Sequence, residues 1–385
     1  MIGFTRPSVQ TELDRFYKSL SKSSVNFESV SKSAFTQSRK KLKPEAFIEL
    51  SNNQLEYFKE HAPSQKTWKD KRIVAIDGSL LNLPHTDDIE KEFGGVSNQH
   101  EKTISARCSF AYDVCNELVL DSKIAPRNSC EKDLAVDHLK YLNPFTDILV
   151  FDRGYPSQWM FGLLKKKGFS FCFRLSTAWK DACQKMANQQ DIDWSMIRRS
   201  KKDLGKLKTY DLPTKTDGLR LVAIELSTGE KEVLVTNLGR KTHTREDLKK
   251  LYHMRWGIEE SYKSFKKTLH IEHFTGRTSL SVKQDFYARV FMLNISSMIR
   301  SQCVDHYQKK HVDSKHVKKA NKTQVLAKTK DFLTDLFYHN NLRKVIKQML
   351  KLLNKRLEIV RPNRSFARKK SASHRKSKIM NSKGI

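Results

Sequence analysis

Two apolar runs that each end in an aspartate constrain the fold of this chain more than any other feature. Residues 72–76 lead to Asp77, and residues 147–151 lead to Asp152. Short apolar runs closed by turn residues are typical of buried strands. An acid at the carboxyl end of such a strand faces the crevice where α/β sheets bind ligands. The runs therefore predict one sheet with two carboxylates at one edge, although either aspartate alone could simply begin a turn.

The segments around these runs complete a mixed α/β pattern. Strands are expected at 105–114 and 117–124, joined as a hairpin, and at 168–175. Helices are expected from Asn128, acting as an N-cap, to residue 142, and over 156–164. Three strands followed by helix, strand, helix and strand indicate a mixed sheet with crossover helices.

Helical patterns lie on both sides of this core. A helix at 9–20 is followed by a Ser-rich, basic segment at 30–42. This segment suits the second helix of a helix-turn-helix, whose polar face lies in a DNA groove. An ordinary amphipathic helix is the alternative. Further helices are expected at 282–307 and 330–353.

The chain divides into segments on this basis. Turn residues and short strands at 220–226 and 232–237 indicate a β-rich insertion. The last 25 residues hold nine Lys or Arg and no acid, which predicts a disordered tail that binds phosphates. The expected segments are a helical DNA-binding region (1–68), the two parts of the core (69–175 and 241–280), the insertion (176–240), a C-terminal helical region (281–358) and the basic tail (359–385).

The charge of the chain points to a polyanionic partner. Lys and Arg number 73 against 42 Asp and Glu, a formal net charge of +31. Nucleic acid is favoured over an anionic membrane surface. No apolar run is long enough to span a membrane, no apolar N-terminal signal is visible, and the six cysteines form no C-x-x-C pair. A cytoplasmic, DNA-associated protein without a zinc site is expected.

The segment 251–266 predicts a helix with an unusual mixture of charges on one stripe. Tyr252, Arg255, Glu259 and Lys266 are separated by three, four and seven residues, and Lys263 follows Glu259 by one turn. Helical geometry places such residues on one face. One carboxylate among several cations suits a metal-ligating acid set among phosphate-binding groups. An exposed, salt-bridged helix face is the alternative.

These positions carry a resemblance to a known family. Residues 252–266 match the pattern Tyr-x2-Arg-x3-Glu-x6-Lys at every position. With the Asp77-Gly-Ser and Asp152-Arg-Gly-Tyr motifs, residues 72–277 resemble a DDE transposase of the insertion-sequence-four family. The resemblance implies a ribonuclease-H-like core interrupted by a β-rich insertion, with Asp77, Asp152 and Glu259 as the catalytic triad.

The resemblance also implies a chemistry and partners. The triad would hold two Mg²⁺ ions, with Mn²⁺ as a possible substitute, for cleavage at transposon ends and strand transfer into target DNA. The double-stranded DNA partners would be terminal inverted repeats and target, bound by a homodimer in a synaptic complex in the bacterial cytoplasm. A metal-dependent nuclease of the same fold that cuts without joining, and a catalytically decayed DNA-binding relative, are the alternatives.

Further residues are expected to bind DNA beside the triad. Arg255, Lys263 and Lys266 are assigned to phosphates, and Tyr252 to a terminal phosphate. Stacking on a flipped base is assigned to Trp256. Three more residues are candidates by location, with core packing or a plain surface position as the alternative: Arg174, Trp179 and Trp194.

Five other titratable residues are set aside. His253, His270 and His273 lack a consistent spacing as metal ligands, and Asp113 and Asp121 lack a flanking motif. All five are predicted to be non-catalytic.

Overall fold

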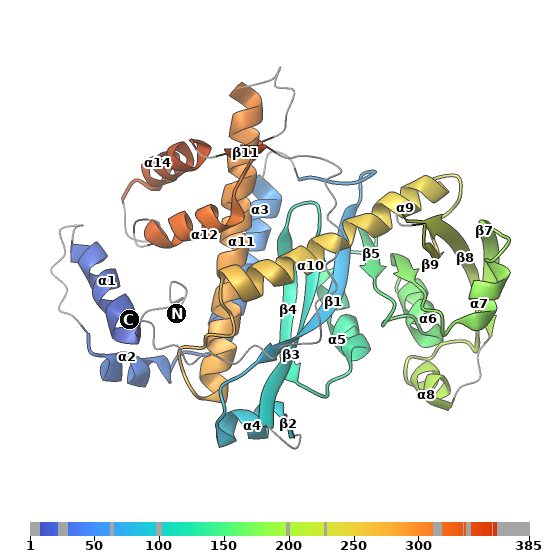
Figure 1. Cartoon of the computed structure of the whole chain (residues 1–385), viewed down its shortest axis with the longest axis horizontal. Coiled ribbons are helices and arrows are strands. Elements are labelled where there is room, and N and C mark those ends of the chain that lie inside the picture. Colours follow the sequence, from blue (N-terminus) through green and yellow to red (C-terminus); the bar gives the residue numbers. More distant parts are fainter. Residues whose placement is uncertain are drawn as a thin grey trace.

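The computed structural model is built around one large mixed sheet with helices on both faces (Figure 1). It describes residues 8–21, 30–61, 65–97, 102–197, 201–226, 229–310, 318–333, 335, 340–355 and 357–359. The predicted basic tail lies outside the described residues, apart from Ile359.

The sheet contains nine strands. In chain order they are β1 (Arg72–Asn82), β2 (Gly95–Ser97), β3 (Lys102–Asp113), β4 (Leu118–Pro126), β5 (Asp147–Phe151), β6 (Ser170–Arg174), β7 (Asp191–Ile197), β8 (Lys215–Glu225) and β9 (Lys231–Thr236). The predicted strands of the core and the hairpin between β3 and β4 are confirmed.

The pairing of β1 and β5 places the two strand-end aspartates side by side. These strands run parallel, and Ile76 and Phe151 are register partners. Asp77 and Asp152 are the next residues of each strand. Neighbouring strands lie about 4.8 Å apart and register partners face the same side of a sheet. Antiparallel β3 flanks β1 on its other side, and parallel β6 flanks β5.

The strands of the predicted insertion extend the same sheet. β8 and β9 lie where two short strands are expected, and β9 pairs antiparallel with β6. The insertion also contains the helices α7 (Lys180–Lys185) and α8 (Lys201–Thr209). Trp179 and Trp194 pack against the core beside β6, with ring centroids 6.2 Å apart. Both rings are only partly buried, so core packing accounts for part of each side chain and their contact with DNA stays a prediction.

Two layers of helices cover the sheet. On one face lie α5 (Glu131–His138), the 3₁₀ turn η1 (Leu139–Tyr141) and α6 (Gln158–Lys166). On the other lie α9 (Arg245–Met254) and α10 (Trp256–Lys263), which cross β5 and β1 in Figure 1. The predicted N-cap of α5 is wrong. Cys130 precedes the helix, and the Asn128 region forms a turn in which Ser129 donates to Pro126.

The C-terminal region is helical but not as expected. α11 (Ser279–Lys310) crosses the β4 side of the sheet, followed by α12 (Lys322–Asp331) and α14 (Leu342–Asn354). A single helix over 330–353 is wrong, because α12 ends at Asp331. The short strands β10 (Lys318–Ala320) and β11 (Leu357–Ile359) pair with each other.

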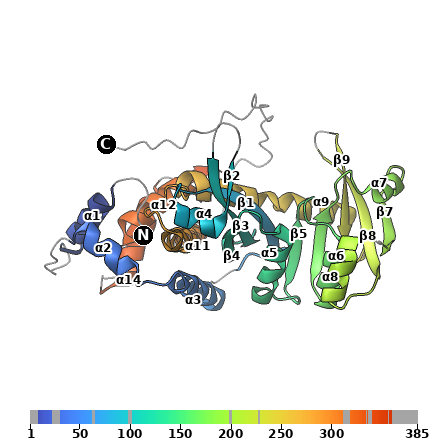
Figure 2. The same cartoon turned by 90° about the horizontal axis from the view of Figure 1, so that it is seen from below.

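The N-terminal helices α1 (Val9–Ser21) and α2 (Lys32–Arg39) lie at one end of the molecule and the insertion lies at the other (Figure 2). The helix α3 (Glu45–His61) packs against α11, and α4 (Asp87–Phe93) follows β1. Arg39 is buried and anchors α2 to α11, donating to Gln284 at 2.6 Å and Asp285 at 2.9 Å. Arg39 therefore cannot lie in a DNA groove, whereas Lys32 and Gln37 of α2 are exposed.

Candidate active site

The three predicted triad acids gather at the carboxyl edge of the parallel strands. Asp77 lies within β1, directly after the last residue of β1 that pairs with β5, and Asp152 directly follows β5. Glu259 is carried by α10. The carboxylate of Asp77 interacts electrostatically with Asp152, Glu259 and Arg255. Acids that lie more than 70 residues apart in the sequence thus interact at one edge of the sheet.

Two residues of the predicted stripe hold two of these acids. The Tyr252 hydroxyl donates to Asp152 Oδ1 at 3.1 Å, and Arg255 Nη2 donates to Glu259 Oε1 at 2.8 Å. The Arg255 guanidinium also lies 5.4 Å from the Tyr252 ring centroid. Both side chains are buried, at 4% and 5% exposure. Tyr252 and Arg255 are therefore built into the site rather than free on the surface.

The electrostatics of the site disfavour its full negative charge. Burial raises the pKa of Asp77 to about 6, and repulsion by Asp152 and Glu259 adds to this rise. The Gly78 amide and Arg255 oppose it but do not cancel it. A bound cation would stabilise the ionised carboxylates of a site that resists ionisation in this way.

The donor set fits a hard divalent cation by its chemistry. All three side chains offer carboxylate oxygens, the ligand type that Mg²⁺ and Mn²⁺ prefer. Among the described residues, no three acids, histidines or cysteines are already arranged as a metal cage. Two of the acids are instead held by Tyr252 and Arg255, contacts that a cation would replace.

The predicted single stripe is only partly retained. The helix is interrupted at Arg255, between α9 and α10, and continues after Lys263 as the π-helix η2 (Ser264–Thr268). Lys263 is exposed and pairs with Glu260, away from Glu259. Lys266 donates to the Leu80 carbonyl of β1 at 2.6 Å. The extra residue per turn of a π-helix changes which side chains share a face, a change that sequence spacing alone does not reveal. Their contacts with phosphate stay predictions.

A further acid, which the sequence did not single out, lies beside the triad. Glu232 of β9 is 7% exposed and pairs with Arg174 of β6 at 2.9 Å. Its Oε2 has no hydrogen-bond partner within the described part of the chain. Burial raises the pKa of Glu232, and Asp152 adds to the rise. Its position at the start of a predicted strand was visible in the sequence, but no flanking motif marked it.

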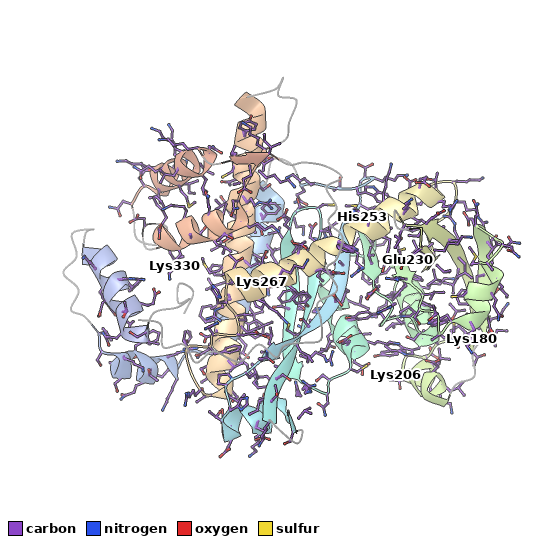
Figure 3. The ribbon with its side chains drawn as sticks, in the orientation of Figure 1. Lys180, Lys206, Glu230, His253, Lys267 and Lys330 are labelled. Carbon is purple, nitrogen blue, oxygen red and sulfur yellow. The ribbon has the colours of Figure 1, made fainter. Side chains whose placement is uncertain are left out.

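The remaining candidates differ in exposure. Trp256 opens α10 with 42% of its surface exposed, so it can reach a bound base. His253 is exposed on α9 (Figure 3). Arg174 is 29% exposed and already paired with Glu232.

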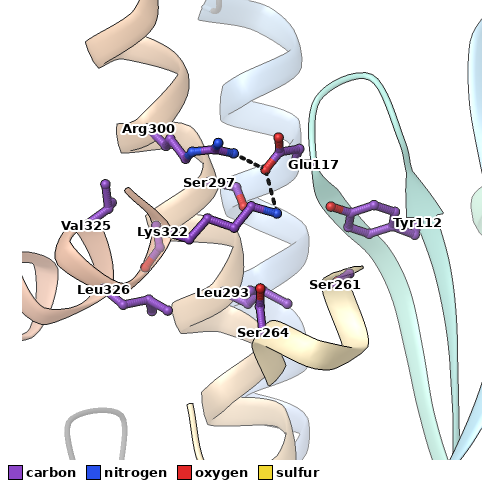
Figure 4. Close-up of a pocket in the computed structure, with 11 residues that line it drawn as sticks. Tyr112, Glu117, Ser261, Ser264, Leu293, Ser297, Arg300, Lys322, Val325 and Leu326 are labelled. Carbon is purple, nitrogen blue, oxygen red and sulfur yellow. Dashed lines mark hydrogen bonds and ion pairs between the residues drawn. The ribbon is translucent and has the colours of Figure 1, made fainter. Parts of the chain in front are cut away.

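A small pocket lies behind the helix that carries Glu259 (Figure 4). Ser261 and Ser264 line it opposite Arg300 of α11 and Lys322 of α12. Both cations pair with Glu117, with Lys322 at 3.0 Å. Burial alone would raise the pKa of Glu117, but these cations lower it to about 2. The pocket thus lies between the C-terminal helices α11 and α12 and the side of α10 and η2 that carries Ser261 and Ser264.

None of the helices in the described part of the chain is both long and apolar enough to cross a bilayer. Among solved structures, the piggyBac transposase in a synaptic complex with hairpin DNA is similar, at 9% identity and a TM-score of 0.39. That match covers 73% of this chain and 57% of the other. Curated proteins give no significant match.

The family comparison is the decisive one. The profile described as "Transposase DDE domain" matches residues 68–295, which include Asp77, Asp152 and Glu259 and more than half of the chain. The protein therefore belongs to the DDE transposase family.

Proposed function

We propose that this transposase cuts DNA at the ends of a bacterial insertion sequence and joins those ends to target DNA. The observation that carries the proposal is the electrostatic interaction of Asp77 with Asp152 and Glu259 at one edge of the sheet. The signature over residues 252–266 favours a member of the insertion-sequence-four type. The mixed sheet with two acids at one edge supports a ribonuclease-H-like core, with β7 to β9 as its insertion.

The triad would hold two Mg²⁺ ions, for which Mn²⁺ could substitute. When bound, such ions stabilise both the attacking and the leaving oxygen of an in-line phosphoryl displacement. The residues of the chain orient this site. Tyr252 holds Asp152, and Arg255 holds Glu259, so both carboxylates are kept at the crevice before metal and DNA arrive.

Arg255 is also suited to bind a phosphate. One guanidinium nitrogen donates to Glu259, while its buried Nε has no hydrogen-bond partner within the described part of the chain. A guanidinium offers a planar fork of donors that matches a phosphate. Trp256, the next residue, is exposed enough to stack on a flipped base.

The partners follow from the chemistry and the charge. The net charge of +31 suits non-specific binding along the DNA backbone. Joining two transposon ends to one target requires two active sites, so we propose a homodimer in the synaptic complex. Action on bacterial DNA places the protein in the cytoplasm.

The test uses DNA taken from directly beside the coding region on each side. Labelled duplexes of this sequence, supercoiled plasmid and Mg²⁺ are incubated with the full chain. We expect cleavage at a defined position and joining of the cut 3′ end to the plasmid. Glu259→Gln should abolish both steps.

Glu260→Gln is the matched control. Glu260 is the next residue of the same helix, is 56% exposed and pairs with Lys263, so this variant should retain activity. Cleavage without joining would indicate a nuclease of the same fold. DNA binding without cleavage by the native chain would indicate a decayed relative, and equal cleavage by Glu259→Gln would refute the triad.

A further inference from the structure

A buried chain of hydrogen bonds reaches the backbone of Asp77 from the opposite face of the sheet. His138 of α5 contacts Asp121 of β4 through Nδ1 at 2.7 Å. Its Nε2 lies 2.9 Å from the hydroxyl of Ser109 on β3. That hydroxyl in turn lies 3.3 Å from the carbonyl oxygen of Asp77 and can donate to it.

These three residue types also form the triad of serine hydrolases. Here, however, Ser109 and His138 are both 0% exposed, so no substrate reaches the hydroxyl. The hydroxyl is directed at a backbone carbonyl rather than at a cavity. The arrangement therefore serves the protein itself, and its end point is the first acid of the active site.

A second hydroxyl converges on the same carbonyl from the other face. The Tyr262 hydroxyl donates to the Asp77 carbonyl at 2.7 Å. Tyr262 is 7% exposed, and its ring stacks on Phe110 with centroids 4.6 Å apart. It lies on α10, three residues after Glu259. This bond ties the helix of the third acid to the strand of the first acid.

The proton count makes the chain directional. A serine hydroxyl has one proton, so Ser109 can donate to Asp77 only when His138 donates to Ser109. The other ring nitrogen of His138 contacts the Asp121 carboxylate, which also pairs with Lys123 at 2.9 Å.

We propose that Asp121, His138, Ser109 and Tyr262 are positioning residues that fix the backbone of Asp77, and with it the direction of its carboxylate. The proposal rests on the proposed function, because it assigns Asp77 as a metal ligand. Partners behind metal ligands orient those ligands, and their loss typically lowers metal affinity about 10–100-fold. The two hydroxyls reach Asp77 from different elements, so removing either one should loosen it.

The test measures metal binding rather than cleavage. Mn²⁺ is titrated into the full chain without DNA and followed by electron paramagnetic resonance, for the native protein and for Ser109→Ala and Tyr262→Phe. Both variants should still fold, as shown by their unfolding transitions, and should bind Mn²⁺ roughly tenfold or more weakly.

Ser296→Ala is the matched control. Ser296 is a buried serine of α11 whose hydroxyl donates to the Met292 carbonyl at 2.8 Å, so the same substitution is made away from the site. It should leave Mn²⁺ affinity unchanged. Native affinity in both folded variants would overturn the positioning role alone. Native protein whose Mn²⁺ binding is absent, or is unaffected by Asp77→Asn, would instead overturn the assigned metal site.

Discussion

The substitution Asp77→Asn should make the metal-free protein more stable while it removes activity. Burial and the neighbouring acids raise the pKa of Asp77 from 3.8 to about 6. Each pKa unit corresponds to about 1.4 kcal/mol, so ionised Asp77 costs the folded state up to about 3 kcal/mol. Asparagine keeps the shape of the side chain and removes the charge.

The effect has a defined pH dependence. The folded protein binds the Asp77 proton more tightly than the unfolded chain does, so this stability is present at low pH. It is lost as the pH rises from about 4 to above 6. The advantage of Asp77→Asn should therefore be largest at pH 8 and fall to about half at pH 5. Urea unfolding with a metal chelator at both pH values measures it.

Asp113→Asn supplies the control. Burial also raises the pKa of Asp113 to about 6, but its carboxylate accepts hydrogen bonds from the Cys115 amide, the Asn116 amide and the Asn116 side chain. Asparagine presents a donor where an acceptor is needed, so this variant should lose about 1–3 kcal/mol. The reasoning fails if Asp77→Asn is no more stable than the native chain at pH 8, or if its advantage does not shrink at pH 5.

Three further outcomes are expected. Arg39→Ala leaves Asp285 buried without its cation and should lower the free energy of unfolding by about 3–5 kcal/mol. A loss below about 1 kcal/mol would contradict the role of Arg39 as an anchor. Glu232→Gln removes the carboxylate that pairs with Arg174 and should free this arginine for a DNA phosphate. The salt dependence of DNA binding, measured by fluorescence anisotropy, should steepen by about one phosphate contact, and an unchanged salt dependence would count against a DNA contact of Arg174. Tyr252→Phe removes the hydrogen bond to Asp152, which should lower the free energy of unfolding by about 1 kcal/mol and slow single-turnover cleavage. A native cleavage rate would show that this hydrogen bond does not orient Asp152.

The sequence predicted the sheet and the triad because both depend on local patterns. The apolar runs before Asp77 and Asp152 must be buried, and burial in one parallel sheet places their ends at one edge. The spacing of Tyr252, Arg255 and Glu259 likewise survives because Arg255, at the break between α9 and α10, keeps a right-handed helical backbone with φ −51° and ψ −30°. These predictions needed no knowledge of which distant segments meet.

The features that were missed depend on long-range contacts. Arg39 lies in the segment expected to face a DNA groove, but its contacts are set by Asp285, which lies 246 positions later in the sequence. Glu232 became an active-site neighbour only because β9 pairs with β6. Asp121 was set aside for lack of a flanking motif, although the fold connects it through His138 to the backbone of the first acid. No local pattern carries this information.

The residue directly before the helix that carries Glu259 supplies the cation that balances this acid, and the pair explains how the acids lie near one another before metal binds. Arg255 is 5% exposed, so a lone guanidinium there would be costly, as would a lone carboxylate. The bond between Arg255 and Glu259 satisfies both. If a divalent cation bound the Glu259 carboxylate, Arg255 would lose its hydrogen-bond partner. A DNA phosphate would then balance the charge of Arg255. Metal and DNA binding should therefore favour each other, with Arg255 exchanging one anion for the other.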